Sequence, residues 1–586
     1  MQCVSLRFAA LLVLVSCSPP QKPCDANSCS GCCDAAGACQ AGNVDVACGF
    51  GGALCGVCNA GTSCQASSCL PIASGGGSGG GATGGGSGGG TQSGTFTISG
   101  HVTYDFVSAR YDVATDRGTL DFANAAQRPV RNAQVRVVEG TTVLATTNTA
   151  ADGAYALTFT ATGSAALSVQ VLAKTSTPPI TVQDNTSQNA VWALGAPIPS
   201  GGGTVDLRAT HGWAGTAFTP GQRTSGPFAI LDSTYTAASA FLAARPSLNF
   251  PLLKVNWSPN NTTDSNGTVA QGFLGTSYFD GELNEIFVVG KDGVDTDEYD
   301  NHVIVHEWGH YFEANVSRSD SLGGDHSSGD VLDPREAFTE GWGNAASGML
   351  LNDPIYADTY FTSGMIDAFG WNLEDEPAPT DDPSRGVFSE SSVMRFLYDV
   401  WDPANEGPFD AVTLGLGPIA DAFTSGHRTT SALATLGSFV TSLKAQPGVD
   451  AAALDTLLAH WNIGPITSDF GAGAPALRAM YQDVISYPLN QSVTLDGREA
   501  YNFASQNKYW VLTGTGARIT VTADSAEDVA IGAYRRGVEV GSADDVLSGP
   551  ETFSFNSTSG TVYIITLTGY GQVSGTYNAT MAITSP

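Results

Sequence analysis

The chain has 586 residues, enough for several domains, and its 25 basic and 56 acidic side chains give a net charge of −31. The basic residues form no cluster along the sequence, which disfavours nucleic acid and anionic membrane surfaces as partners. The acidic balance is compatible with an exported protein, with basic substrates, or with Ca²⁺ bound in acidic loops.

Residues 1–16 predict a signal peptide, because Arg7 precedes an apolar stretch, Phe8–Val15, that is too short to span a bilayer. The run Leu14–Cys17 resembles the bacterial lipobox, in which cleavage leaves Cys17 as the lipidated first residue. An ordinary signal peptide followed by an incidental cysteine is the alternative. The segment therefore predicts a bacterial outer-membrane or cell-surface lipoprotein, or a secreted protein, with membrane contact only through a lipid anchor at Cys17.

Residues 17–73 contain ten cysteines after Cys17 in a segment too small to form a stable apolar core. Exported segments of this kind are usually held by disulfides. The spacings Cys29–Cys32 and Cys55–Cys58 could instead bind structural zinc, but the segment has no histidine, so we favour disulfides. Residues 74–94 are nearly pure Gly and Ser and predict a flexible linker.

Residues 95–205 alternate with a period of two, as Val135 and Val137 face one way while Arg136 faces the other. This pattern predicts an all-β domain. Three short runs resemble the carboxypeptidase regulatory-like β-sandwich: Ser99–Val102, Pro129–Ala133 and Asp152–Tyr155. The resemblance implies a binding or spacing role, without catalysis.

Residues 206–482 mix the two periodicities and predict an α+β domain, with helices near 234–244 and 391–400 and a strand over 281–290. Five acidic residues crowd the segment that follows the strand: Asp292, Asp295, Asp297, Glu298 and Asp300. They are compatible with a Ca²⁺ site or with a solvated acidic loop.

The next stretch, 301–314, contains His306-Glu307-Trp308-Gly309-His310 and predicts a helix capped by Asp300 or Asn301. Positions i and i+4 lie on one face of a helix, so His306 and His310 can bind one Zn²⁺. Glu307 would then lie beside a zinc-activated water and could take its proton. A chance match on a core helix is the alternative.

A catalytic zinc needs a third protein ligand. Val316 stands where a metzincin has a third histidine, so a carboxylate from the following helix is expected. Asp333 and Pro334 fit the N-cap and first turn, and Glu336 falls where it can close a capping box. Glu340 lies one turn further and has no such duty, so we predict Glu340 as the ligand and keep Glu336 as the alternative.

The sequence HEWGH followed by TEGWGNAAS resembles the glutamate-zincin metallopeptidases, closest to the fungalysin type and similar in logic to thermolysin. The resemblance implies that His306, His310 and Glu340 bind zinc and that Glu307 is the general base. One position departs from the family pattern. Asn344 stands where the family has an acidic residue that orients a zinc histidine, so weaker support of that histidine is expected.

Peptide hydrolysis also needs a donor to the oxyanion, and the wider class uses Tyr or His on a later helix. Tyr398 and His427 are the two candidates, although each could be a packing or loop residue. His302 and His326 receive no predicted role. In peptidases of this type, the strand before the zinc helix pairs with the substrate, so the edge of 281–290 is a candidate for this role, and an ordinary sheet strand is the alternative that the sequence leaves open.

Residues 483–586 return to a period of two and predict a second all-β domain. Three runs carry this pattern: Ala517–Thr522, Thr561–Leu567 and Gly575–Met581. They resemble the bacterial pre-peptidase C-terminal domain, a β-sandwich often appended to secreted peptidases.

Together these patterns predict a multidomain chain with an α+β zincin-like catalytic domain flanked by all-β sandwich domains and preceded by a small disulfide-rich segment. The predicted function is an exported zinc metallopeptidase that hydrolyses a protein or peptide substrate. One alternative is a non-catalytic surface adhesion or binding lipoprotein that retains a peptidase scaffold. Another keeps zinc hydrolysis but directs it at glycoproteins or peptidoglycan stems.

Overall fold

The computed structural model describes residues 91–586 except 378–379, 381, 404–406 and 499, together with short strands between residues 32 and 71. The predicted signal peptide, the lipidation site at Cys17 and the linker up to residue 90 lie outside the described residues. Cys32 is buried, whereas the side chains of the other cysteines lie outside the described residues, so the disulfide pairing stays a prediction. Among the described helices, none is both long and apolar enough to cross a membrane.

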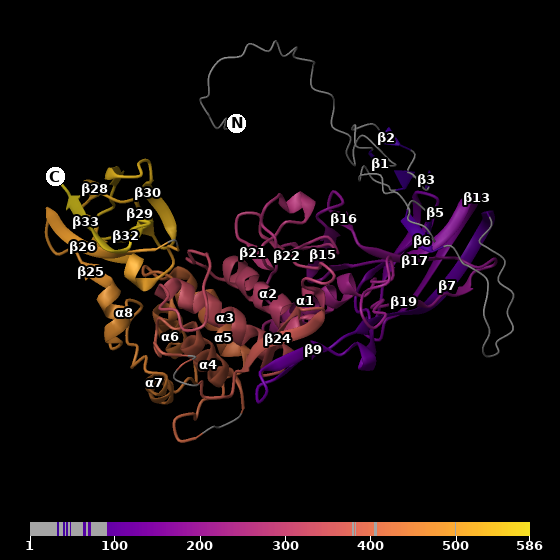
Figure 1. The fold of residues 1–586 in the computed structure, drawn as a ribbon, viewed down its shortest axis with the longest axis horizontal. Helices are drawn as coiled ribbons and strands as arrows, with labels where there is room; N and C mark the ends of the chain where they lie inside the picture. The colour runs from indigo at the N-terminus through magenta and orange to yellow at the C-terminus, as the bar shows by residue number, and fades with distance from the viewer. Residues whose placement is uncertain are drawn as a thin grey trace, which may run out of the picture.

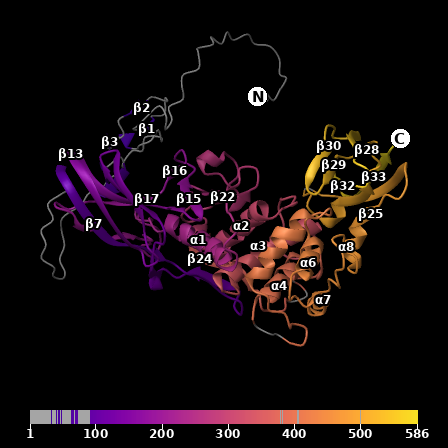
Figure 2. The same ribbon diagram turned by 180° about the vertical axis from the view of Figure 1, so that it is seen from behind.

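Three parts follow one another along the long axis of the molecule, and both views show the helices between two β-rich regions (Figure 1, Figure 2). The chain is thus multidomain and rich in β-sheet. The short N-terminal strands pair as β1–β2, β3–β4 and β5–β6; their bounds are Cys32–Cys33, Cys39–Gln40, Asn43–Val44, Ala47–Cys48, Thr62–Gln65 and Ser68–Pro71.

The N-terminal β domain is built on two long antiparallel strands, β7 (Thr91–Phe106) and β13 (Ala154–Leu172). Their alternation places Ile98 and Val102 of β7 beside Leu157 of β13 in the core. The other strands of this eight-stranded sheet are β10 (Ala126–Pro129), β11 (Gln134–Glu139), β12 (Thr142–Asn148), β17 (Ala193–Pro197), β18 (Gly203–Thr204) and β19 (Leu207–Ala209).

A central sheet follows in the order β14-β15-β20-β22-β21, with β16 paired to β15. Its strands are β14 (Lys174–Ser176), β15 (Pro179–Asp184), β16 (Ala190–Val191), β20 (Leu253–Trp257), β21 (Tyr278–Asp280) and β22 (Glu285–Val288). The strands β14 to β16 lie within residues 95–205 yet belong to this sheet, so the central region draws on chain before residue 206. The predicted strand 281–290 becomes β22, which lies inside the sheet, and β21 forms the edge.

The helices pack against this sheet and against one another. The main ones are α1 (Gly226–Ala244), α2 (Asn301–Val316), α3 (Pro334–Leu351), α4 (Glu390–Trp401), α5 (Leu416–Ala422), α6 (Leu436–Lys444), α7 (Ala451–His460) and α8 (Pro475–Met480). Helices α2 and α3 approach closely because Gly309 and Gly343 meet at the crossing, where a Cβ on Gly309 would lie 3.1 Å from Gly343 Cα. The Trp342 indole closes the contact by donating to the Gly309 carbonyl at 2.9 Å.

Two hairpins connect the N-terminal β domain with the central region. Strands β8 (Ala109–Asp112) and β9 (Arg117–Leu120) form one hairpin, and β23 (Ile355–Thr362) and β24 (Met365–Asn372) form the other. Arg117 pairs with Asp367, and the Gly118 amide donates to the same carboxylate at 3.2 Å. The first hairpin is therefore held against the second.

The C-terminal region has two antiparallel sheets that enclose one apolar core, the arrangement of a β-sandwich. One sheet contains β27 (Asn507–Thr513), β29 (Val529–Arg535), β30 (Val538–Ala543) and β32 (Val562–Gly569), with β25 (Tyr481–Asp483) added in parallel; the other contains β26 (Leu489–Gly497), β28 (Arg518–Ser525), β31 (Gly549–Asn556) and β33 (Gly575–Thr584). Tyr509 and Asn507 of β27 bond Asp333 and Arg335 at the start of α3. This domain is thus anchored to the helix that carries Glu340.

Candidate metal centre

The three predicted metal ligands converge between α2 and α3. The Nε2 atoms of His306 and His310 lie 2.9 Å apart, and Glu340 Oε2 lies 3.1 Å from the first and 3.6 Å from the second. The ligand atoms of all three residues lie within 4.8 Å of one another. Two imidazoles and one carboxylate at this spacing are a donor set that zinc accepts.

His306 is oriented by a chain of two hydrogen bonds that ends on a carboxylate. Its Nδ1 lies 2.8 Å from Asn344 Oδ1, an atom that can only accept, so Nδ1 donates and Nε2 is free to bind metal. The Asn344 amide in turn donates to Glu390 Oε1. Asn344 itself carries no charge, but the Glu390 carboxylate that it bonds does. Glu390 therefore offsets the weaker support of His306 that was expected from Asn344.

His310 is oriented in a similar way from the other side. Its Nδ1 lies 3.2 Å from Thr339 Oγ1, and that hydroxyl donates its proton to Glu313 Oε2 at 2.6 Å. The Thr339 oxygen is thus an acceptor for the His310 ring, which again leaves Nε2 directed at the cluster. Nothing in the local sequence pattern had assigned a role to Thr339 or Glu313.

The Glu340 carboxylate is buried but strongly favoured as an anion. Burial alone would raise its pKa, but His310, His306 and His326 outweigh that effect and hold the pKa of Glu340 well below its usual value. Two imidazoles and one carboxylate whose ligand atoms lie within 4.8 Å of one another fit a zinc ion.

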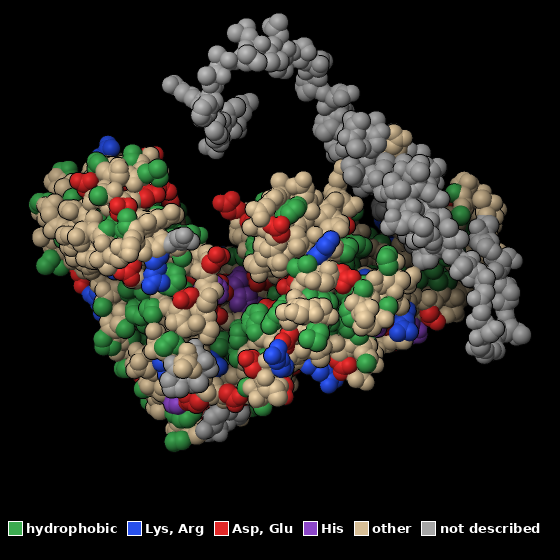
Figure 3. All heavy atoms as spheres, viewed as in Figure 1, with side chains coloured by type: hydrophobic (Ala, Val, Ile, Leu, Met, Phe, Trp, Pro, Cys, Tyr) green, Lys and Arg blue, Asp and Glu red, His purple; other side chains and the backbone are tan. Residues whose placement is uncertain are grey.

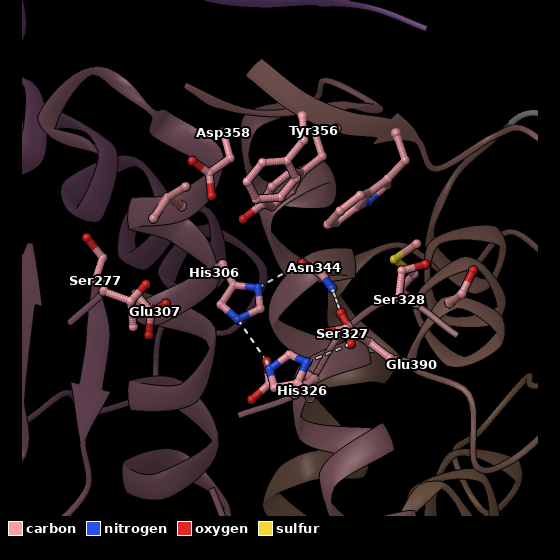
Figure 4. A pocket seen from close by; sticks show the side chains of 18 of the residues that line it. Ser277, His306, Glu307, His326, Ser327, Ser328, Asn344, Tyr356, Asp358 and Glu390 are labelled. Atoms are coloured by element: carbon pink, nitrogen blue, oxygen red, sulfur yellow. Dashed lines mark hydrogen bonds and ion pairs between the residues drawn. The ribbon is translucent and has the colours of Figure 1, made fainter. Parts of the chain in front are cut away.

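Glu307 projects from the same helix toward the sheet edge. Its carboxylate accepts a hydrogen bond from the Phe279 backbone of β21, and burial raises the pKa of Glu307 while the neighbouring His306 opposes the rise. In the close-up view, Glu307 and Ser277 lie on one side of His306, and Asn344, His326 and Glu390 lie on the other (Figure 4). Glu307 thus lies between the predicted ligands and the edge strand.

These groups line a cavity of 1260 Å³. Its walls come from β21, the loop 323–328, hairpin β23–β24 and α4, and Tyr111, Val113 and Asp116 of the N-terminal domain's hairpin β8–β9 also line it. The space-filling view shows histidine side chains in the hollow between the C-terminal domain and the central region (Figure 3).

His326 had no predicted role, yet the structure places it in the site. Its Nε2 lies 3.3 Å from Glu340 Oε2 and its Nδ1 lies 3.0 Å from Glu390 Oε2. The loop that carries His326 is held by Glu336, whose Oε2 accepts from the Ser321 hydroxyl and from the amides of Leu322 and Gly323. A histidine in a Gly/Ser/Asp-rich loop gives no sequence signal of this placement.

The role predicted for Glu336 is wrong in part. Asp333 is the N-cap of α3 and accepts from the Arg335 amide at 3.0 Å, as predicted. Glu336, however, turns toward the loop at 321–323 and closes no capping box. It also lies outside the group of ligand atoms formed by His306, His310 and Glu340.

The structure does not bring Tyr398 and His427 to the site. Tyr398 is buried beside Trp401, and His427 is fully buried beside Phe338. Burial lowers the pKa of His427 to about 3, so it is a neutral core residue. Neither residue lines the cavity, and both fail as oxyanion donors because their helix positions face the core.

His302 bonds Ser347 at 3.0 Å and does not join the ligands.

Comparison with known proteins relates the central region to secreted metallopeptidases. Residues 238–460 match the family described as Mycolysin C-terminal domain, a segment that contains α2 and α3. No curated protein matches this chain.

Two solved structures cover short parts of the chain. The pre-peptidase C-terminal domain of collagenase from Bacillus anthracis is 11% identical over 17% of this chain and 93% of that chain, with a TM-score of 0.14. CorA, a surface-associated copper-binding protein of Methylomicrobium album BG8, is 9% identical over 18% of this chain and 98% of that chain, also with a TM-score of 0.14. At these TM-scores neither likeness bears on fold or function.

Proposed function

We propose that this chain is an exported, zinc-dependent metallopeptidase that hydrolyses peptide bonds of protein substrates. One observation carries the proposal: His306, His310 and Glu340 present their ligand atoms within 4.8 Å of one another on the wall of a cavity that Glu307 also lines. The Mycolysin match over the same helices supports it. The signal peptide and the lipid anchor at Cys17 remain part of the proposal.

Zinc held by these three residues would polarise a peptide carbonyl and lower the pKa of a water molecule toward neutrality. Glu307 is placed to take the proton of the attacking water and to pass it to the leaving amine. Its buried position beside His306 keeps the carboxylate close to the ligands, while the Phe279 amide fixes its direction. Glu307 is therefore the general base.

The edge strand β21 supports the binding of an extended substrate. It is the last strand of the central sheet, and Tyr278 and Phe279 line the cavity beside Glu307. An exposed sheet edge can add a peptide as a further strand through main-chain hydrogen bonds. β21 thus takes the role that the sequence had assigned to the strand at 281–290.

His326 replaces Tyr398 and His427 as the donor to the oxyanion. It faces the cavity next to Glu340, and Glu390 holds its Nδ1. Tyr356 lines the same cavity, where its ring stacks on Trp371 at 4.4 Å. A hydrogen bond to the developing oxyanion typically contributes about 10²–10³ in rate. We expect most of that contribution from His326, because Glu390 holds its Nδ1 while its Nε2 faces the proposed ligand Glu340.

The test is the hydrolysis of casein by zinc-loaded protein and by its Glu307→Gln variant, with zinc content measured in both. Loss of the general base should lower kcat by about 10²–10⁴ while zinc content stays unchanged. Glu282→Gln is the matched control, because Glu282 is exposed and loses the same charge without lining the cavity. Undiminished hydrolysis by Glu307→Gln would refute the proposal, and zinc binding without hydrolysis in the unmodified protein would favour a retained, non-catalytic scaffold.

A further inference from the structure

A second group of potential metal ligands lies near the first, and three of its four members, Asp295, Asp297 and Asp358, line the same cavity as Glu307. Asp295, Asp297 and Asp300 come from the segment just before α2, and Asp358 comes from β23. One carboxylate oxygen of each lies within 4.8 Å of the others. We call these four residues the aspartate quartet.

The quartet differs from the acidic run that the sequence suggested. Asp292 accepts from the Phe218 amide at 3.2 Å, and Glu298 pairs with Arg223, so both point elsewhere. Asp358 takes their place although it lies 58 residues after Asp300. The segment before α2 runs beside β23, because Asp295 forms a β-bridge with Tyr360.

The quartet has no cationic partner among the described residues: none of its four carboxylates forms an ion pair with Lys, Arg or His, and the adjacent Glu298 is the residue that pairs with Arg223. Neutral groups bind some of the oxygens: Ser277 donates to Asp297 Oδ2, and the amide and hydroxyl of Thr359 donate to Asp300. These bonds orient the carboxylates but leave four acidic groups together.

One carboxylate oxygen of the quartet, Asp297 Oδ1, lacks a partner in the part of the chain that the structure describes. Asp297 is 4% exposed, and its Oδ1 atom has no hydrogen-bond partner among the described residues. A buried carboxylate oxygen without a donor is costly, because the group has lost water and gained nothing in return. Because the Asp297 carboxylate contributes one oxygen to a group of four whose oxygens lie within 4.8 Å of one another, a cation held among them would offer Asp297 the partner that Oδ1 lacks.

The energetics agree with this geometry. Burial, followed by the neighbouring Asp297, raises the pKa of Asp295 to about 12, and burial raises the pKa of Asp358 as well. A buried group of carboxylates is costly to keep charged unless a cation lies among them.

The oxygen donors of the quartet determine which metal ion it can bind. Carboxylate oxygens from four residues suit a hard cation, and Ca²⁺ takes six to eight oxygens in flexible geometry, whereas Mg²⁺ keeps several waters and demands octahedral order. Zinc prefers nitrogen and sulfur donors, which the quartet lacks. We propose that the aspartate quartet binds a Ca²⁺ ion that fastens hairpin β23–β24 to the N-terminus of α2, beside the candidate zinc site.

This inference does not rest on peptidase activity. The ion would fix two walls of one cavity, since Tyr356 and Trp371 of the hairpin line it together with Glu307 of α2. Hairpin β8–β9 packs on the outer side of the same hairpin through Arg117. Calcium would thus set the position of the cleft wall to which the N-terminal β domain is attached.

The experiment is a calorimetric titration of CaCl₂, and separately of MgCl₂, into the zinc-loaded full chain, with thermal unfolding recorded in excess CaCl₂ and in EGTA. We expect about one Ca²⁺ per chain and a rise of roughly 5 °C in the unfolding transition near saturation. Zinc content is measured in every sample so that loss of zinc to EGTA is recognised. Casein hydrolysis is not needed for either readout.

Asp358→Asn is the decisive variant, with Glu282→Gln as the control of equal charge change on the exposed surface. The variant should lose calcium binding, yet in EGTA it should be about as stable as the unmodified chain, because the amide keeps the size of the side chain and adds no charge to the buried group. Asp297→Asn should behave in the same way.

Three results would overturn the proposal: no calcium binding by the unmodified chain, calcium binding unchanged in Asp358→Asn, or lower stability of that variant in EGTA as well as in calcium. A fourth result would also overturn it: a lysine-containing peptide binds in place of calcium, and Asp358→Asn weakens the binding of that peptide. The quartet would then be a subsite for a substrate ammonium group.

Discussion

The central helices and the C-terminal β domain are both closely packed, but they bury different kinds of side chain. The C-terminal domain encloses an apolar core in which Trp510, Leu512 and Ile565 are almost fully buried. The region around α2 and α3 buries His306, Glu307 and Glu340 instead, among apolar neighbours.

Burying charged groups costs free energy that apolar groups would contribute. The apolar core of the C-terminal domain is explained by folding stability alone. The buried ionisable side chains of the central region are not, because they lower that stability. Two groups of these buried ionisable side chains are the His306–His310–Glu340 cluster and the aspartate quartet. Variants in the central region should therefore change metal binding and catalysis, whereas variants in the C-terminal core should change stability.

A large effect on zinc binding in the central region is expected from Gly343→Ala. A Cβ at this position would lie 2.8 Å from His306 Cε1 and 3.0 Å from Nε2, so the ring must move. We expect zinc affinity to fall by more than about tenfold, as for the loss of a group that orients a ligand. Equilibrium dialysis of zinc would measure it. Gly281→Ala is the control, since its Cβ would meet nothing closer than 3.9 Å; equal zinc affinity in both variants would contradict the close-approach argument.

Asn344→Asp should weaken the site, although the resembling family has an acidic residue there. The new carboxylate would face Glu390, which already accepts from the Asn344 amide, and like charges at this distance repel. We expect zinc affinity to fall by about 10- to 100-fold and to recover in Asn344→Asp/Glu390→Gln, where one carboxylate again supports His306. Stronger zinc binding by the single variant would show that Glu390 does not act through Asn344.

Trp510→Ala tests the other side of the comparison. Its ring is fully buried in the C-terminal core and its indole donates to Gln491 at 3.0 Å, so truncation should cost about 3–5 kcal/mol in the unfolding of this domain. Denaturant unfolding followed by far-UV circular dichroism would measure the loss, because Trp510 is the one tryptophan of residues 483–586 and the variant lacks it. Zinc content should stay unchanged. A variant that lost zinc as well would show that the anchor from β27 to the start of α3 controls the metal site.

The parts of the site that lie close together in the sequence could be predicted from it. The spacing of His306 and His310 requires only a helix, and Asp333 with Pro334 marks where the next helix begins. Glu340 followed because Glu336 had another explanation, although Glu336 in fact binds the loop at 321–323. Local rules sufficed for these residues because helix geometry fixes which side chains share a face.

The remaining residues could not be predicted because tertiary contacts place them. His326 reaches Glu340 from an irregular loop, and Asp358 joins the quartet from a hairpin. Neither segment has a periodicity that reveals where its side chains point. Tyr398 and His427 failed for the opposite reason: each lies on a helical turn whose inward face packs into the core. The β domains could be recognised by alternation, but the passage of β14 to β16 into the central sheet could not.

The central claim is that His306, His310 and Glu340 form one catalytic zinc site, and the most direct test compares the full chain with Glu340→Ala and Glu336→Gln. Zinc content and casein hydrolysis would be measured for all three. We predict about one zinc per chain with hydrolysis in the unmodified protein, loss of both in Glu340→Ala, and retention of zinc in Glu336→Gln. A Glu340→Ala variant that still held zinc and cleaved casein would contradict the account.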